Sequence, residues 1–138
     1  MTIHTEQMSE IFTKHHLLEL GFSATVHVFT APEPEDADFH DHPYGFNSFI
    51  MDGWYIERRY EIDGSYNDIK RNTFDSFYVF SDDIHKIIDM SPICTTIIVP
   101  NDNGKHIRKP GFYRFENGKA FHRFWDETEF KPVQNLNF

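Results

Sequence analysis

Cysteine is nearly absent from this chain, and its scarcity restricts the chemistry available to the protein. A single residue, Cys94, excludes an internal disulfide. It lies inside the apolar run 93–99, so we expect a buried thiol rather than a nucleophile. The lack of disulfides makes the cytoplasm the expected location.

Long apolar segments and positive charge are also scarce. No apolar run approaches the roughly 20 residues of a membrane span, and the polar start, residues 1–9, shows no cleavable signal, which again favours the cytoplasm. The 13 Lys and Arg residues are outnumbered by 22 Asp and Glu, which gives a net charge of −9. A field of this sign opposes binding to nucleic acid or to an anionic membrane surface, and neither partner is expected.

Aromatic residues are abundant, at 17% of the 138 residues, and they favour strands over helices. The length suits a single domain, 1–138. Asp52-Gly53 and Asn117-Gly118 are typical of two-residue hairpin turns. Short strands are expected over residues 22–30, 46–51, 54–62, 74–80, 84–90, 93–99, 112–115 and 119–124. The predicted fold class is all-β, a sandwich or barrel whose core covers about 22–125.

The two ends of the chain carry different signals. Ser9 can cap a helix over Glu10–Leu20, and Gly21 fits the left-handed residue after its end. A short N-terminal helix is therefore predicted within 1–21. The tail, 126–138, is expected to be irregular.

Histidines supply the clearest functional signal. His40 and His42 are spaced i, i+2 on an extended segment, so they point to the same face. Neutral imidazole is the commonest protein ligand for zinc, iron, copper or nickel, and we predict that these two residues bind a metal together with His85. Asp41, between them, is expected to point outward, where it can orient a loop or pair with a cation.

Two segments resemble the two motifs of the cupin superfamily. Phe39-His40-Asp41-His42 with Gly53 matches the first motif, whose Glu position falls on Phe46 or Asn47, and Asp82-Asp83-Ile84-His85 matches the second. A narrower resemblance, over about residues 25–125, is to small bacterial and phage cupin-like proteins that carry an H-D-H-P-W motif and have no assigned function. It rests on His27-Val28-Phe29, His40-Asp41-His42-Pro43-Tyr44, Gly53, Tyr55, Glu57 and Gly111-Phe112-Tyr113. The resemblance implies a single-domain double-stranded β-helix, the jelly-roll barrel of cupins.

The register of the predicted 46–62 hairpin suggests a fourth ligand. With Asp52-Gly53 as the turn, Ser48 pairs with Glu57 and Phe46 pairs with Arg59, and paired residues share a face. The cupin Glu, here at the Phe46 position, points into the barrel, so Glu57 is expected to point there too. Glu57 is therefore the predicted fourth metal ligand, with an ion pair to Arg59 as the alternative.

Three residues are candidates for substrate binding. The same register turns Tyr55 and Arg59 inward. An inward arginine is costly unless it is paired, and its functional use would be to hold a substrate carboxylate or phosphate. His27, on the strand 22–30, either lines the same cavity or makes a hydrogen bond in the core.

Three functions remain open. In the first, a divalent ion (Fe, Mn, Ni or Zn) serves a dioxygenase, isomerase or lyase that acts on a small polar acid. In the second, the protein is a non-catalytic binding module with degenerate cupin motifs. In the third, it is a metal-independent sugar isomerase or epimerase, for which His85 and Asp89, at i and i+4, are the candidate acid–base pair. A small-molecule ligand is expected, and a homodimer is a candidate assembly because pairing covers exposed sheet edges.

Overall fold

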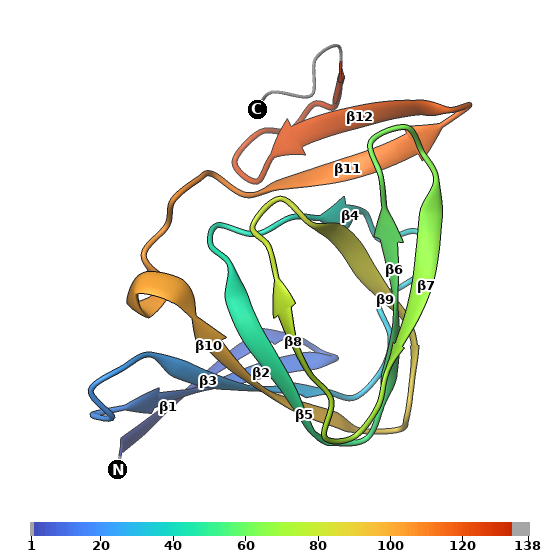
Figure 1. Cartoon of the computed structure of the whole chain (residues 1–138). Coiled ribbons are helices and arrows are strands. Elements are labelled where there is room, and N and C mark those ends of the chain that lie inside the picture. The colour runs from blue at the N-terminus through green and yellow to red at the C-terminus, as the bar shows by residue number, and fades with distance from the viewer. Residues whose placement is uncertain (1, 134–138) are drawn as a thin grey trace.

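The computed structural model describes residues 2–133, which form two antiparallel sheets that close into a barrel (Figure 1). The first sheet has the order β1 (Thr2–Ser9), β2 (Phe12–Leu18), β3 (Ala24–Phe29), β10 (Cys94–Pro100), β5 (Phe46–Asp52) and β8 (Ser76–Val79). The second has the order β13 (Lys131–Pro132), β12 (Lys119–Phe124), β11 (Gly111–Glu116), β4 (Phe39–His40), β9 (Ile84–Met90), β6 (Tyr55–Tyr60) and β7 (Tyr66–Arg71). A 3-10 turn, η1 (Asn101–Gly104), follows β10. This architecture confirms the predicted all-β, jelly-roll class, and no helix among the described residues has the length and apolarity to cross a membrane.

The core lies between the sheets and is made by alternate residues of the strands. On β10 the side chains of Cys94, Thr96 and Ile98 are buried, while those between them are half-buried. The thiol of Cys94 is fully buried, as expected, and it packs with Ile50, Tyr55, Ile87 and Met90 in one cluster. This period-two burial is what a strand with one face toward a core requires.

The predicted N-terminal helix over Glu10–Leu20 is wrong. The segment is β2, which pairs with β1 on one side and with β3 on the other. Ser9 caps a tight turn instead of a helix, because its Oγ accepts the N–H of Ile11 at 3.2 Å. Phe12 stacks on Phe29 of β3 with ring centroids 4.5 Å apart. Pairing with β3 therefore outweighs the weak helical pattern of this segment.

The predicted hairpin at Asp52-Gly53 is also wrong, because β5 and β6 belong to different sheets. The chain turns a corner at Gly53, whose φ of +83° is left-handed. A Cβ at this position would collide with the carbonyl oxygen of Ile93 and the hydroxyl of Ser91, so the corner requires glycine. On both sides of the corner, the alternate residues expected to face the interior do so. The prediction that Ser48 and Glu57 share the barrel interior is confirmed by their burial.

Other turns follow the sequence more closely. Asn117 and Gly118 both have positive φ, and they join β11 to β12 in a two-residue hairpin that pairs Glu116 with Lys119, as predicted. The strand predicted over residues 84–90 is β9, which begins and ends at the predicted residues. Strand β7, Tyr66–Arg71, is not among the predicted strands. The tail 126–138 lies partly outside the described residues, and within them it forms β13.

Candidate metal centre

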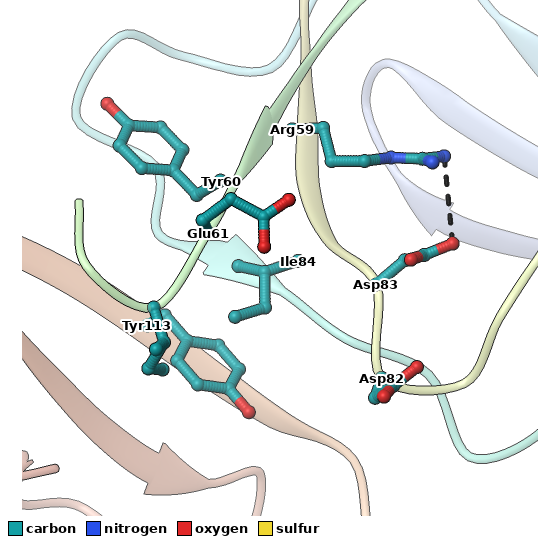
Figure 2. Close-up of a pocket in the computed structure, with 8 residues that line it drawn as sticks. Arg59, Tyr60, Glu61, Asp82, Asp83, Ile84 and Tyr113 are labelled. Carbon is teal, nitrogen blue, oxygen red and sulfur yellow. Dashed lines mark ion pairs between the residues drawn. The ribbon is translucent and has the colours of Figure 1, made fainter. Parts of the chain in front are cut away.

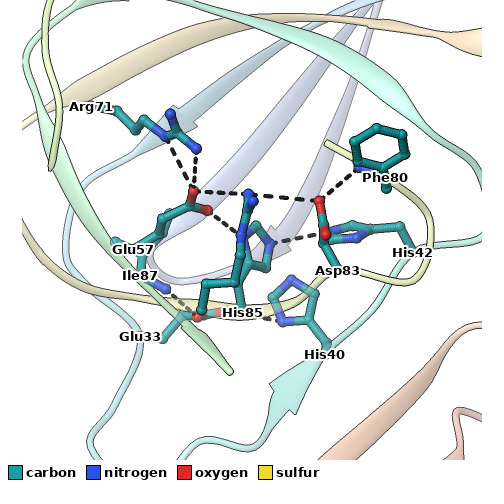
Figure 3. A network of polar contacts seen from close by, with 10 residues as sticks. Glu33, His40, His42, Glu57, Arg71, Phe80, Asp83, His85 and Ile87 are labelled. Atoms are coloured by element: carbon teal, nitrogen blue, oxygen red, sulfur yellow. Dashed lines mark hydrogen bonds and ion pairs between the residues drawn. The ribbon is translucent and has the colours of Figure 1, made fainter. Parts of the chain in front are cut away.

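The three predicted histidines come together at the second sheet. Strand β4 lies between β11 and β9, which places His40 directly opposite His85 in the ladder. His42 follows β4, where its backbone N–H donates to the carbonyl of Ser81 at 2.9 Å. One potential ligand nitrogen from each ring lies within 4.8 Å of those of the other two. The spacing in the sequence therefore does correspond to one cluster (Figure 3).

The separation of His42 and His85 suits shared coordination. Their Nε2 atoms are 3.0 Å apart. Two nitrogens bound at right angles to one ion through bonds of about 2.1 Å lie about 3.0 Å apart. Without an ion, one of the two nitrogens must carry a proton and donate to the other. The donor set and its spacing thus fit a divalent metal.

Burial keeps these imidazoles in their ligating form. It lowers the pKa of His40 from 6.5 to about 3, and the neighbouring charge of a protonated His85 acts in the same direction. Burial also holds the pKa of His42 well below its ordinary value. Both rings are therefore neutral at pH 7 and keep the lone pair that a metal needs.

Glu57 lies behind His85 rather than within the cluster of three nitrogens. Its Oε2 accepts a hydrogen bond from His85 Nδ1 at 2.6 Å, and its Oε1 accepts from Arg71 at 2.7 and 3.1 Å and from Arg59 at 3.1 Å (Figure 3). The carboxylate is fully buried. Burial opposes its ionisation, but the His85 hydrogen bond and the two guanidinium groups outweigh it, and the pKa of Glu57 falls to about 2. A proton on His85 Nδ1 leaves the Nε2 lone pair facing the site.

A second acid, Glu33, lies beside His40, and sequence reasoning missed it. Its Oε1 is 3.8 Å from His40 Nδ1, and its Oε2 accepts the backbone N–H of Ile87 at 2.9 Å. Burial raises its pKa, although the Ile87 N–H partly offsets this effect. Residues 31–38 carry several acids and two prolines, a pattern that indicates only a solvated loop. No local signal marks Glu33 as the acid that reaches His40.

The histidines line a cavity of about 550 Å³, within the range of small-molecule sites. Tyr55 and His27, both expected to bind substrate, line it as well. Burial raises the pKa of Tyr55, so its phenol stays protonated. Most of the wall is apolar, formed by Phe12, Phe29, Phe46, Val79, Ile87 and Ile98 among others.

Arg59, the third expected substrate residue, lines a different pocket of about 240 Å³ with Tyr60, Glu61, Asp82, Asp83 and others (Figure 2). Its guanidinium pairs with Glu57 at 3.1 Å and with Asp83 at 3.7 Å. The ion pair with Glu57 is the alternative that the sequence left open. The guanidinium thus already has two carboxylate partners within the fold.

Asp41 pairs with a cation, as expected, but it is buried rather than outward. Its carboxylate accepts the backbone N–H of Gly111 at 2.7 Å and the hydroxyl of Tyr113 at 2.8 Å, and it lies 3.1 Å from Arg108. These contacts tie the His40–His42 segment to β11. Asp41 therefore positions the histidine segment.

The proposed pairing of His85 with Asp89 is wrong. A bulge shifts the register, since Glu57 opposes Ile87 while Ile56 opposes Asp89, and Ile88 is the extra residue. The bulge reverses the face that Asp89 presents, and its side chain is exposed. The acid that contacts His85 is Glu57.

Comparison with known proteins identifies the fold. No family model and no curated protein match the sequence. Hydroxypropylphosphonic acid epoxidase from S. wedmorenis is 14% identical, with a TM-score of 0.59 over 71% of this chain and 55% of that chain. The iron(II) form of HppE gives a TM-score of 0.58 at 14% identity, over 71% of this chain and 56% of the other. A mutant of Bacillus subtilis oxalate decarboxylase gives a TM-score of 0.60 at 14% identity, over 78% of this chain and 29% of that chain.

These neighbours have the cupin fold, and the likeness shows that the present chain shares it. The chain spans about half the length of the epoxidase and under a third of the decarboxylase. Within this fold, the three histidines form a group whose nitrogens could hold one metal ion.

Proposed function

We propose that this cupin-fold protein is a divalent-metal-dependent enzyme that acts on a small organic acid. The observation that carries the proposal is the convergence of His40, His42 and His85 on the wall of a mostly apolar cavity. Three protein ligands leave coordination positions for water or substrate, which is the pattern of catalytic rather than structural sites. A metal-independent binding module has no need of three imidazoles held this close.

The donor set suits Fe(II), Mn(II), Ni(II) or Zn(II), and affinity alone does not choose among them. When bound, such an ion supplies Lewis-acid chemistry, or redox chemistry if it is iron or manganese. Dioxygenase, isomerase and lyase reactions all fall within these two classes. Two of the structural neighbours are named for acids, a phosphonic acid and oxalate, and this supports an acid as substrate.

We infer that Glu57 serves the site through His85 rather than as the fourth ligand that the sequence suggests. Both of its oxygens already accept hydrogen bonds, from His85 and from two arginines. The carboxylate holds the His85 proton on Nδ1 and fixes the ring, while Arg59 and Arg71 keep the carboxylate ionised. Turning Glu57 toward the three histidines would leave both guanidinium groups without this partner in a largely buried position, which is unfavourable.

A second candidate function rests on the same pair. A histidine held 2.6 Å from a buried carboxylate is also the arrangement of a general base, as a metal-independent sugar isomerase or epimerase requires. In that case His85 would take the substrate proton at Nε2, and Glu57 would stabilise the resulting imidazolium. Metal content separates the two functions.

The test is elemental analysis of protein purified without a polyhistidine tag or chelator. We expect near-stoichiometric iron, manganese, nickel or zinc in the wild type and its loss in His40→Ala and His85→Ala. His4→Ala, on the exposed strand β1, is the matched control and should retain the metal. Wild-type protein that takes up none of the four ions, even after incubation with each, would exclude the metal-dependent function. A metal-positive result is followed by screening small acids for turnover and dioxygen uptake.

A further inference from the structure

The unpredicted N-terminal hairpin contributes a cation to the cavity. Lys14 lies on β2, directly opposite His27 of β3, and both residues line the cavity that contains the three histidines. Its ammonium group lies 5.6 Å from the centre of the Phe12 ring. Burial, followed by the Lys14 charge, lowers the pKa of His27 to about 3. The same charge adds to the effect of burial in lowering the pKa of His40.

The nearest acid to Lys14 along the sheet is Glu6, its partner on β1, whose charge acts on the ammonium group without forming an ion pair with it. No hydrogen bond or ion pair joins its Nζ to residues 2–133, and burial lowers its pKa. Glu6, opposite it on β1, is exposed, and its carboxylate contacts His16 at 3.0 Å. Lys86 provides the contrast, because its Nζ donates to the carbonyls of Pro34, Glu35 and Ala37 at 2.8–3.2 Å. A desolvated cation without such partners is unfavourable unless a ligand supplies the anion.

The two carboxylates of the cavity wall have other partners. Asp41 is held by Tyr113 and Arg108, and Glu33 accepts the N–H of Ile87. Neither carboxylate pairs with Lys14, and Glu6 acts on it only from an exposed position on β1, so the ammonium group can pair with an anion that enters the cavity. The rest of the wall is mainly aromatic and aliphatic, which suits a ligand with an apolar body.

We propose that the cavity binds an organic anion with an apolar body, whose carboxylate or comparable acidic group is held by Lys14. The apolar body then packs against Phe12 and Phe29, and the opposite end of the molecule faces the three histidines. Arg59, which pairs with Glu57 and Asp83, takes no part. This proposal narrows the substrate class of the proposed function to acids with an apolar body. It rests on the proposed function only for the reaction at the three histidines, because binding of the anion by Lys14 needs no metal.

The test compares a carboxylate with its neutral amide. Binding of 3-phenylpropionate and of 3-phenylpropanamide is measured by calorimetry on the full chain, with and without added Zn²⁺. We expect the wild type to prefer the acid by about tenfold or more, the value of one charge-assisted hydrogen bond. Lys14→Met should lose this preference, and Lys14→Arg should restore much of it. Lys119→Met, at an exposed position on β12 outside the cavity, should behave as the wild type.

Each outcome bears on one of the two proposals. Equal binding of acid and amide by the wild type, or no detectable binding of either, would overturn the anion site. A preference that appears only with Zn²⁺ and survives in Lys14→Met would also overturn it, because the acid would then bind the ion. A Lys14-dependent preference in protein that takes up no metal would support the anion site while excluding the metal-dependent function.

Discussion

His85 and Glu57 are 28 residues apart in the chain, yet His85 Nδ1 and Glu57 Oε2 are only 2.6 Å apart in the barrel interior. The contact arises because β6 and β9 are neighbouring strands in which Arg59 opposes His85 and Glu57 opposes Ile87, so that Glu57 and His85 are diagonal neighbours. It fixes which nitrogen of His85 is free to act in the cavity. Any chemistry at the three histidines therefore depends on Glu57, which does not itself line the cavity.

Replacing Glu57 by Gln should weaken metal binding and reduce stability. The amide keeps the volume and can still accept from His85, but it leaves Arg59 and Arg71 without the charge of this buried partner. We expect metal affinity to fall by about 10–100-fold and stability to fall by about 3–5 kcal/mol. Metal titration and urea unfolding measure the two effects. The control is Glu61→Gln, at an exposed position directly after β6. A complete loss of metal binding by Glu57→Gln with little change in stability would instead indicate that Glu57 is a metal ligand.

Much of the fold can be predicted from local sequence patterns. The two wrong predictions, the helix over 10–20 and the hairpin at Asp52-Gly53, both concern segments whose structure is decided by pairing with distant strands. Strand β9 and the Asn117-Gly118 hairpin are predictable because burial and turn chemistry are encoded locally. The corner at Gly53 carries the same Asp-Gly signal as a hairpin, and only the pairing partners of the two strands distinguish the cases. Segment 10–20 contains a strand because β3 offers it a partner.

Some residues of the candidate site can be predicted from the sequence, and others depend on the tertiary structure. The three histidines are predictable from the H-x-H spacing and the resemblance, and the structure brings them together. Arg71, Glu33 and Lys14 are not, because each enters the site through a strand register or a loop path that no neighbouring residues specify. Sequence spacing could locate the cluster, but its supporting charges required the tertiary structure.

The stability of the metal-free protein should fall as the pH decreases, in part because of His27. Its pKa is about 3 in the folded state against an ordinary 6.5. Between these values the unfolded chain takes up a proton that the folded protein does not bind, so the stabilising contribution is complete above pH 6.5 and is lost as the pH falls toward 3. Each such group contributes a slope of about 1.4 kcal/mol per pH unit. Urea unfolding from about pH 7 to about pH 4 should give a shallower slope in His27→Gln than in the wild type; identical slopes would contradict this account.

The corner at Gly53 should tolerate no side chain. Gly53→Ala combines a left-handed backbone with a collision against the Ile93 carbonyl, whereas Gly118→Ala, at φ +74°, has no atom within 4 Å of the new methyl group. The control should therefore lose only the conformational term of about 1 kcal/mol, and Gly53→Ala should lose at least twice as much. Thermal or urea unfolding of both variants measures the difference. Equal losses would mean that the corner can relax around the methyl group.

The role of Asp41 in anchoring the His40–His42 segment can be tested by comparing the stability lost in Asp41→Asn with that lost when the Asp38–Arg114 ion pair is broken. Asp41→Asn retains the shape of the side chain but leaves Arg108 without a charged partner and weakens the bonds from Gly111 and Tyr113. We expect a loss of about 1–3 kcal/mol of stability, because all three partners meet a carboxylate that is fully buried. Asp38→Asn, which removes the partner of the half-exposed Arg114, is the matched control and should lose no more than about 1 kcal/mol. If the two variants lose equal stability, the Asp41 carboxylate does not hold the His40–His42 segment against β11, and the position of this segment then depends on the backbone pairing of β4 with β9 and β11.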